Sequence, residues 1–311
     1  MRQLLVLSGK GGTGKTTVAA SLIALSGCTS YADLDVDAPN LHLILGQETE
    51  PETNNWYGYE KAMLNPEVCS GCGACEAACQ FGAIRNLVVD LYACEGCGVC
   101  EAVCPVLDKQ GQKAIRMVET VTGQTMMYHG PLPQGSESNI TAERIFATAE
   151  LRMGSGASGK LVSAVRKNLY DALGTNAISG KTQEAREKLV ILDGSPGIGC
   201  PVIASVTGVD AVLIVTEPTI SGLHDLTRLS QVAAGFGVPC LACINRYDMH
   251  TGFADKIETH CQTLGIPVLA RIPYDKAAVE AVQRGIPLVN MPDSPVAKAL
   301  RTLWENLKEK F

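Results

Sequence analysis

Residues 2–17 read RQLLVLSGKGGTGKTT, and this stretch decides the fold. Its apolar run at 4–7 is predicted to be a buried strand, and residues 15–26 have the pattern of a helix. Between them, GKGGTGKT at 9–16 fits the phosphate-binding pattern G-x-x-x-x-G-K-[ST]. Glycines allow backbone N–H groups to close around phosphate oxygens, and the helix N-terminus adds a favourable dipole. The sequence therefore predicts a nucleotide site at this turn.

The side chains of this loop have separate expected roles. Lys15 is expected to contact the β- and γ-phosphates, and the Thr16 hydroxyl to ligate Mg²⁺. The alternative, an accidental glycine-rich turn, does not explain the flanking strand and helix. Lys10 is a second lysine that the ordinary pattern does not require, and it could also be a solvated loop residue. The nucleotide contacts expected in the loop are Gly9, Lys10, Gly11, Gly12, Thr13, Gly14, Lys15, Thr16 and Thr17.

The rest of the chain alternates strand-like and helical segments, which predicts an α/β fold with a doubly wound, mostly parallel sheet. We assign residues 1–58 and 114–311 to this domain. Residues 47–60 are polar and rich in turn formers, so a domain boundary is expected there. A helix is expected near 160–173. The expected strands include AIRMVETV, TMMYHG, RIFATAEL, KLVILDGSPG, AVLIVTEPT, VPCLACINR and IPVLARIPYD, with a loop GPLPQGSESN after the second.

An internal cysteine repeat interrupts this pattern. Residues 69–79 read CSGCGACEAAC and residues 94–105 read CEGCGVCEAVCP. Each half has the spacing C-x-x-C-x-x-C-x-x-x-C, the ligand run of two-cluster ferredoxins, in which the fourth cysteine ligates the other cluster. Zinc is the alternative, although zinc sites typically use paired C-x-x-C units. We predict a small inserted α+β ferredoxin domain at 59–113, with one [4Fe–4S] cluster on Cys69, Cys72, Cys75 and Cys104 and the other on Cys94, Cys97, Cys100 and Cys79.

With its extra Lys10, the loop resembles the deviant phosphate loop of the MinD/ParA/Mrp branch of P-loop ATPases, which includes the nitrogenase iron protein. The resemblance implies that Lys10 reaches across a homodimer to the partner's nucleotide. DLDVDAP at 33–39 is similar to the first switch of that branch. This similarity implies that Asp35 lies near the attacking water or Mg²⁺, and a helix cap is the alternative for such carboxylates.

Two further segments extend the resemblance. LVILDGSPG at 189–197 has the form of a Walker B element, which implies that Asp193 holds Mg²⁺ through water. Asn245, together with Pro273 and Asp275, matches positions that contact the base in this branch, and ATP is favoured although NRYD is also similar to a guanine-reading motif.

The whole combination resembles MinD-superfamily ATPases that contain an inserted ferredoxin domain. The resemblance implies ATP, Mg²⁺ and two [4Fe–4S] clusters as cofactors. We expect ATP binding and hydrolysis in a homodimer to drive electron transfer, or the assembly or delivery of a metal–sulfur cofactor, on a partner protein. The alternative is a MinD- or ParA-like switch that positions components in cell division.

Five cysteines lie outside the repeat. Cys240 and Cys243 fall in a predicted strand, where their odd spacing points them to opposite faces, so buried thiols are expected. Cys28 and Cys261 receive the same interpretation. Cys200 follows Asp193 by seven residues and resembles a cluster-ligating cysteine of the nitrogenase iron protein, whose second cysteine has no counterpart here. Cys200 is therefore either a packing residue or a ligand shared between two protomers.

Composition limits the partners. The net charge is −6 and no cluster of Lys or Arg is present, which argues against nucleic-acid binding. The sequence begins with a strand-like segment that leaves no room for a signal peptide, so we expect a reducing cytoplasm. In that compartment, thirteen cysteines indicate metal ligation and not disulfides. The final segment places Val296, Leu300, Leu303, Leu307 and Phe311 on one helical face. We expect this face to pack on its own domain, with membrane contact as the alternative.

Overall fold

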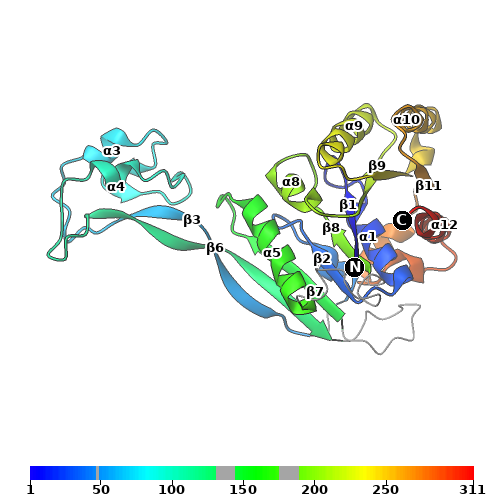
Figure 1. Cartoon of the computed structure of the whole chain (residues 1–311), viewed down its shortest axis with the longest axis horizontal. Helices are drawn as coiled ribbons and strands as arrows, with labels where there is room; N and C mark the ends of the chain where they lie inside the picture. The colour runs from blue at the N-terminus through cyan, green and yellow to red at the C-terminus, as the bar shows by residue number, and fades with distance from the viewer. Residues whose placement is uncertain (47–48, 131–143, 175–188) are drawn as a thin grey trace. The chain divides into compact units, whose positions relative to one another are not determined.

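The computed structural model describes residues 1–46, 49–130, 144–174 and 189–311, and the chain forms two compact units (Figure 1). The first unit comprises residues 1–53, 125–150 and 158–311, and the second comprises 54–124 and 151–157. The predicted junctions at 58/59 and 113/114 therefore differ from the observed ones. Most of the loop expected at 130–139 lies outside the described residues.

The described strands of the larger sheet follow the order β11-β10-β9-β1-β8-β2-β7-β6-β3. The seven strands from β11 to β7 pair in parallel throughout. The predicted α/β fold with a mostly parallel sheet is thus confirmed. The strands are β1 (Arg2–Leu7), β2 (Ser30–Asp33), β3 (Glu52–Leu64), β6 (Ile115–Gly130), β7 (Arg144–Leu151), β8 (Leu189–Asp193), β9 (Ala211–Thr216), β10 (Cys240–Asn245) and β11 (Val268–Ile272).

Helices cover both faces of this sheet, which explains why its central strands are apolar throughout. On β1, Leu4 and Val6 pack with the core beneath α1 and α12, whereas Leu5 and Leu7 are buried on the opposite face. The helices of the first unit are α1 (Lys15–Ser26), α2 (Leu41–Ile44), α5 (Ser158–Leu173), α8 (Cys200–Val206), α9 (Ile220–Gly235), α10 (Thr251–Thr263), α11 (Ala277–Gln283) and α12 (Pro295–Lys310). The described part of this unit also contains two short 3₁₀ turns, Tyr247–Met249 and Leu288–Asn290.

The terminal helix α12 packs on its own domain, as expected. Val296, Leu300, Leu303 and Leu307 are at most 5% exposed and belong to the same core as β11 and α1. The face considered for membrane contact is therefore already occupied. None of the helices among the described residues has the length and apolar character needed to cross a bilayer.

The second unit is small and repeats its own structure. Helices α3 (Ala74–Ala78) and α4 (Val99–Val103) each begin after a glycine in the left-handed region, at φ 73° and 75°. A short antiparallel pair, β4 (Ile84–Arg85) with β5 (Val88–Val89), lies between them in sequence. The duplicated cysteine motif therefore produces a duplicated local fold, as an internal repeat should.

The boundary between the units after Thr53 lies within the stretch 47–60 where a domain boundary was expected, but most of this stretch forms a long two-stranded ribbon and not a turn-rich linker. Residues 52–64 form β3, and β6 runs without a break through both segments that were predicted as separate strands. Cross-strand contacts join Thr120 to Tyr59 and Gln124 to Asn55, so the two strands are antiparallel. Pairing along the ribbon satisfies backbone groups even where the side chains are polar and exposed, and this pairing overrides local turn propensity.

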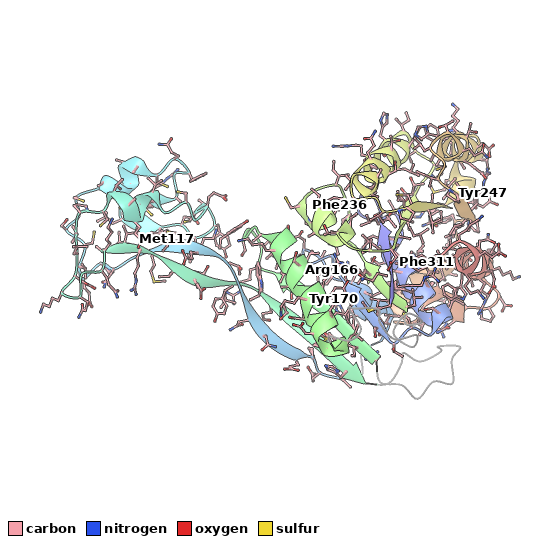
Figure 2. The ribbon with its side chains drawn as sticks, viewed as in Figure 1. Met117, Arg166, Tyr170, Phe236, Tyr247 and Phe311 are labelled. Atoms are coloured by element: carbon pink, nitrogen blue, oxygen red, sulfur yellow. The ribbon has the colours of Figure 1, made fainter. Side chains whose placement is uncertain are left out.

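Arg166 fixes α5 to α8 (Figure 2). The side chain is 8% exposed, and its Nη1 donates to the carbonyl oxygens of Ala204, Ser205 and Thr207 at 2.8, 3.1 and 2.6 Å. These carbonyls lie at the C-terminal end of α8, where intrahelical donors are missing. The hydroxyl of Tyr170 accepts a further hydrogen bond from Nη2. A single cation therefore satisfies the end of the helix that follows β8.

The substitution Arg166→Met should lower the free energy of unfolding by about 2–3 kcal/mol, because it leaves buried carbonyl oxygens without donors. Denaturant titration followed by circular dichroism measures this change. The adjacent Lys167→Met removes only an exposed ion pair with Asp171 and should cost about 0–0.5 kcal/mol. Equal effects of the two substitutions would show that the Arg166 contacts do not stabilise the fold.

Candidate functional site

The phosphate-loop sequence occupies the turn between β1 and α1, as predicted. Gly14 precedes α1 with φ 88°, and a Cβ there would lie 2.4 Å from Nδ2 of Asn245. A Cβ at Gly9 would lie 1.9 Å from the Cβ of Asp225 in α9. Neither position has room for a Cβ atom, and Gly14 also has a left-handed backbone conformation, so glycine is required at both.

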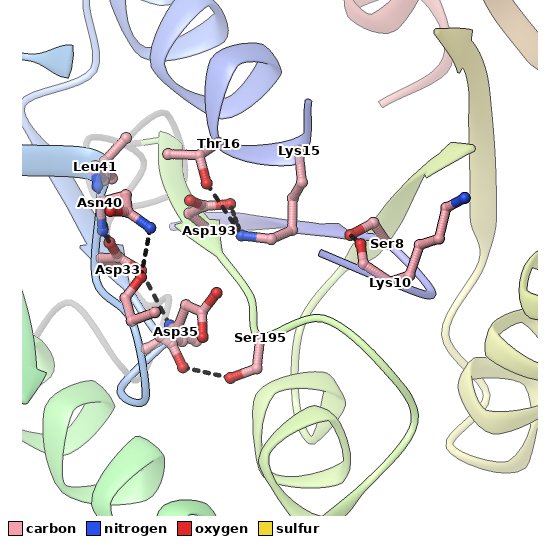
Figure 3. Close-up of polar contacts among 12 residues, drawn as sticks. Ser8, Lys10, Lys15, Thr16, Asp33, Asp35, Asn40, Leu41, Asp193 and Ser195 are labelled. Atoms are coloured by element: carbon pink, nitrogen blue, oxygen red, sulfur yellow. Dashed lines mark hydrogen bonds and ion pairs between the residues drawn. The ribbon is translucent and has the colours of Figure 1, made fainter. Parts of the chain in front are cut away.

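Lys15 lies beside the carboxylate at the end of β8 (Figure 3). Its Nζ is 2.6 Å from Oδ1 of Asp193 and 3.3 Å from Oγ1 of Thr16. The parallel register pairs Val6 with Asp193, which brings the Walker B acid to the loop. Burial opposes the charge of Lys15, but the carboxylates, led by Asp193, outweigh it and raise the pKa of the ammonium group. The structure thus brings three predicted site residues together.

Two polar atoms at this site have no hydrogen-bond partner in the part of the chain that the structure describes. They are Oδ2 of Asp193 and Oγ1 of Thr13, and both are buried. A buried polar atom without a partner costs about 1–3 kcal/mol. Both atoms are therefore suited to contact a bound group, and Asp193 Oδ2 has the oxygen chemistry that Mg²⁺ prefers.

Asp33 organises the segment that follows β2. Its carboxylate accepts hydrogen bonds from the backbone N–H groups of Asp35, Asn40 and Leu41, each at 2.9 Å. Two of these donors lie at the start of α2, so the helix-cap alternative applies to Asp33. Burial, with Asp193 adding to it, raises the pKa of Asp33 to about 7. Sequence reasoning missed this residue, although an acid at a strand end before a turn is a usable signal.

Asp35 lies in the same segment and is only half-buried. Desolvation raises its pKa to about 6. The segment is tied to the turn after β8, because Oγ of Ser195 donates to the Leu34 carbonyl at 2.7 Å (Figure 3). The N–H of Leu34 donates to the Asp193 carbonyl at 2.7 Å. The predicted first-switch segment at 33–39 therefore contacts the end of β8 and the turn that follows it, next to the phosphate loop.

Lys10 does not join Lys15, since its side chain points away from the Asp193 carboxylate (Figure 3). It forms an ion pair with Glu217 at 3.2 Å, and the Lys10 side chain is 42% exposed. Glu217 also accepts a hydrogen bond from Arg246 at 2.6 Å. The sequence reading did not identify Glu217, whose position just after a buried strand was the available signal.

The three residues predicted to contact the base line one pocket with Gly14 and Thr17 of the loop and helix α1. Asn245 Nδ2 donates to the Thr13 carbonyl at 2.7 Å. Asp275 accepts hydrogen bonds from the N–H of Ala277 and the hydroxyl of Ser294, which lower its pKa. Asn245, Pro273 and Asp275 are thus adjacent to the loop.

The second unit brings several of the repeat cysteines near one another. Cys79, Cys94, Cys97 and Cys100 line one pocket. Burial raises the pKa of Cys75, and the thiols of Cys69 and Cys104 lie close enough to add to that effect. As the side chains stand, no group of three or more His, Cys, Asp or Glu residues within the described ranges is arranged to hold a metal ion. The ligand sets therefore stay predictions.

The other cysteines divide as expected, with one exception. Cys28, Cys243 and Cys261 are buried, and desolvation raises their pKa values to about 11, 12 and 11. Cys240 is partly buried, with a pKa of about 11. Cys200 is exposed at the first position of α8, so a packing role is not supported.

Comparisons with known proteins agree with this geometry. Residues 4–288 match the family described as the CobQ/CobB/MinD/ParA nucleotide binding domain. The chain belongs to this family. One relative is an uncharacterised protein of Methanocaldococcus jannaschii, which is 29% identical over 99% of this chain and 96% of its own length. An iron–sulfur cluster carrier protein of Pyrococcus horikoshii is 26% identical over 99% of this chain and 86% of the carrier.

Solved structures of MinD proteins share the fold of this family member. The cell division ATPase MinD of Pyrococcus furiosus has a TM-score of 0.57 and 22% identity, covering 100% of this chain and 99% of MinD. The septum site-determining protein MinD of Pyrococcus horikoshii, solved with Mg-ADP, has a TM-score of 0.56 and 21% identity, covering 98% of this chain and 95% of that one. At these identities the likeness concerns the fold alone.

The raised pKa of Asp35 predicts a pH-dependent effect of Asp35→Asn on stability without nucleotide. The folded pKa of about 6 exceeds the unfolded value of about 3.9, so the folded protein binds a proton that the unfolded chain does not. The ionised carboxylate therefore destabilises the fold above pH 6, and this cost disappears as the pH falls toward 4. Asp35→Asn should stabilise the protein at pH 7.5 and keep only about half of that advantage at pH 5.

Denaturant titrations at both pH values measure the difference between variant and wild type. Asp293→Asn, at an exposed position outside this segment, is the matched control and should show no such change, whereas Asp37 is unsuitable because its charge adds to the raised pKa of Asp35. A difference for Asp35→Asn that is the same at pH 7.5 and pH 5 would contradict the assignment.

Proposed function

We propose that this chain is an iron–sulfur ATPase that couples ATP binding and hydrolysis in a homodimer to electron transfer, or to delivery of a metal–sulfur cofactor, on a partner protein. The observation that carries the proposal is the presence, in one chain, of an assembled phosphate-loop site and an inserted unit with a doubled cysteine motif, four of whose cysteines line one pocket. Neither feature alone would favour coupling over a simple ATPase or a simple ferredoxin.

The nucleotide side follows from the contacts of the first unit. Lys15 supplies the cation for the β- and γ-phosphates, and Thr16 with Asp193 holds Mg²⁺. The unpartnered Oδ2 of Asp193 fits this role, because hydration or coordination would satisfy it. Asp35 orients the attacking water, and Lys10 contacts the partner protomer's nucleotide. Asn245, Pro273 and Asp275 contact the base.

The small core of the second unit supports resident metal centres. Its buried apolar cluster consists of Ala62, Cys75, Ala83, Ile84, Cys94, Cys100 and Ile115, so three of its seven members are cysteines. A unit of this size obtains only a modest free energy of folding from apolar burial, and natural small domains often add a metal or disulfides. All eight repeat cysteines are free thiols. Metal ligation would therefore add stability to this core.

The donor set fits [4Fe–4S] clusters. Backbone N–H groups approach two of the sulfurs, with Gly71 N 3.4 Å from Cys69 Sγ and Ala62 N 3.5 Å from Cys94 Sγ. Such hydrogen bonds are a common means of tuning cluster potentials. When bound, the clusters supply one-electron transfer. The iron–sulfur carrier name of the Pyrococcus horikoshii relative is consistent with metal–sulfur chemistry.

Two further observations bear on the competing functions. Cys200 is exposed, which agrees better with a ligand shared between protomers during delivery than with packing. The apolar face of α12 is buried, so the feature that favoured a membrane-bound spatial organiser loses its support. The MinD-like fold does not by itself favour that organiser, because the fold is common to several activities.

Lys15→Ala should reduce Mg-dependent ATP hydrolysis to background, since it removes the only cation held against Asp193 in the described contacts. Phosphate release assays on the purified protein measure this loss. Lys298→Ala, at an exposed position on α12, is the control and should hydrolyse ATP at the wild-type rate. Wild-type activity in Lys15→Ala would remove the nucleotide part of the proposal.

The anaerobically purified protein should contain about eight iron atoms per chain, as two [4Fe–4S] clusters require. Adding Mg-ATP to the reduced protein should change its electron paramagnetic resonance spectrum, and the Lys15→Ala variant should show no such change. Iron near zero would reject the clusters. If the iron content is full but Mg-ATP does not change the spectrum, the proposed coupling between nucleotide and clusters is rejected.

A further inference from the structure

Lys61 is a buried cation with an unusual environment. It lies in β3, is 6% exposed, and donates a hydrogen bond from Nζ to the backbone carbonyl of Cys94. None of the ion pairs between described residues includes it. Burying an ammonium group without an anion is costly, and one neutral carbonyl does not offset that cost. The geometry therefore calls for a negative charge beside Lys61.

The cysteine quartet next to Lys61 can provide that charge. Lys61 bonds the carbonyl of Cys94, and the N–H of the following residue, Ala62, lies 3.5 Å from Cys94 Sγ. β3 thus contacts Cys94 at both its carbonyl and its sulfur. Cys94 lines the pocket that also holds Cys79, Cys97 and Cys100. Four thiolates around a core of charge 2+ carry a net charge of 2−, which becomes 3− on reduction.

We propose that Lys61 is the counter-charge of the centre held by Cys79, Cys94, Cys97 and Cys100, and that it raises the reduction potential of that centre. This inference rests on the proposed function. A nearby cation stabilises the more negative, reduced form, and net charge near a cluster is one of the factors that set its potential. Burial matters because solvent screens an exposed charge much more strongly than a buried one.

The charge of Lys113 acts on Cys104 of the other quartet, but Lys113 is less deeply buried than Lys61. Lys113 is only half-buried, and its Nζ donates to the carbonyls of Glu101 and Ala102 at 2.6 and 2.9 Å, at the end of α4. Lys109 is exposed. The two centres therefore differ in their electrostatic surroundings, despite the repeated ligand motif. Lys61 therefore tunes the reduction potential of its centre without being one of the metal ligands.

Redox titration of the full chain, followed by electron paramagnetic resonance, tests the proposal on wild type, Lys61→Met, Lys61→Arg and Lys109→Met. Lys61→Met should disfavour reduction of one centre roughly tenfold, a downward shift of about 59 mV for a one-electron couple, and leave the other unchanged. Lys61→Arg should restore the wild-type value, and Lys109→Met should match wild type.

Unchanged potentials in Lys61→Met, or equal shifts of both centres, would overturn the inference. If Lys61→Met loses one cluster, retention of that cluster by Lys61→Arg supports the counter-charge, and its loss from both variants overturns it. Wild-type protein without iron rejects the proposed function separately. Should that protein hold zinc instead, chelator competition tests Lys61 directly, because Lys61→Met must then release one zinc ion more readily than wild type.

Discussion

The buried ion pair between Lys15 and Asp193 is the interaction on which the nucleotide site depends. Each charge would be costly to bury alone, so neither side chain can leave without replacement by another ionic group. The pair is possible because β1 and β8 are neighbours in a parallel sheet and pair Val6 with Asp193. The same edge also receives Asp33 from β2, which pairs in register with Asp193. Sheet topology, more than loop sequence, therefore assembles the site.

Contacts extend from this site to the points where the chain enters the second unit. The chain passes between the units after residues 53, 124, 150 and 157. The last crossing immediately precedes α5, and Arg166 of α5 holds the end of α8, the helix that follows the Asp193 strand. A Cβ at Gly159 in α5 would also lie 3.2 Å from the Cβ of Cys200. Any coupling between the nucleotide site and the proposed metal centres has these covalent and hydrogen-bonded connections available.

Much of this arrangement was predictable from local sequence. The phosphate loop, the apolar strands and the cysteine spacing each depend on residues that are close together in the sequence. The ribbon of β3 and β6 was not predictable, because its polar, exposed residues carry no apolar alternation and its strands are stabilised by each other. Asp33, Glu217 and Arg166 were missed for a related reason. Their partners are backbone groups or side chains distant in sequence, which composition and spacing do not reveal.

Four cationic side chains are buried among the described residues, namely Lys15, Lys61, Arg144 and Arg166, and three of them are accommodated in different ways. Lys15 has a carboxylate, Asp193, at 2.6 Å. Arg166 has no anion but meets three backbone carbonyls at a helix end, where the partial negative charge of the helix dipole lies. Lys61 has one carbonyl alone, and that carbonyl belongs to a cysteine of the repeat. This single neutral contact, at a cysteine of the repeat, is the reason for proposing that thiolate-bound metal supplies the anion beside Lys61.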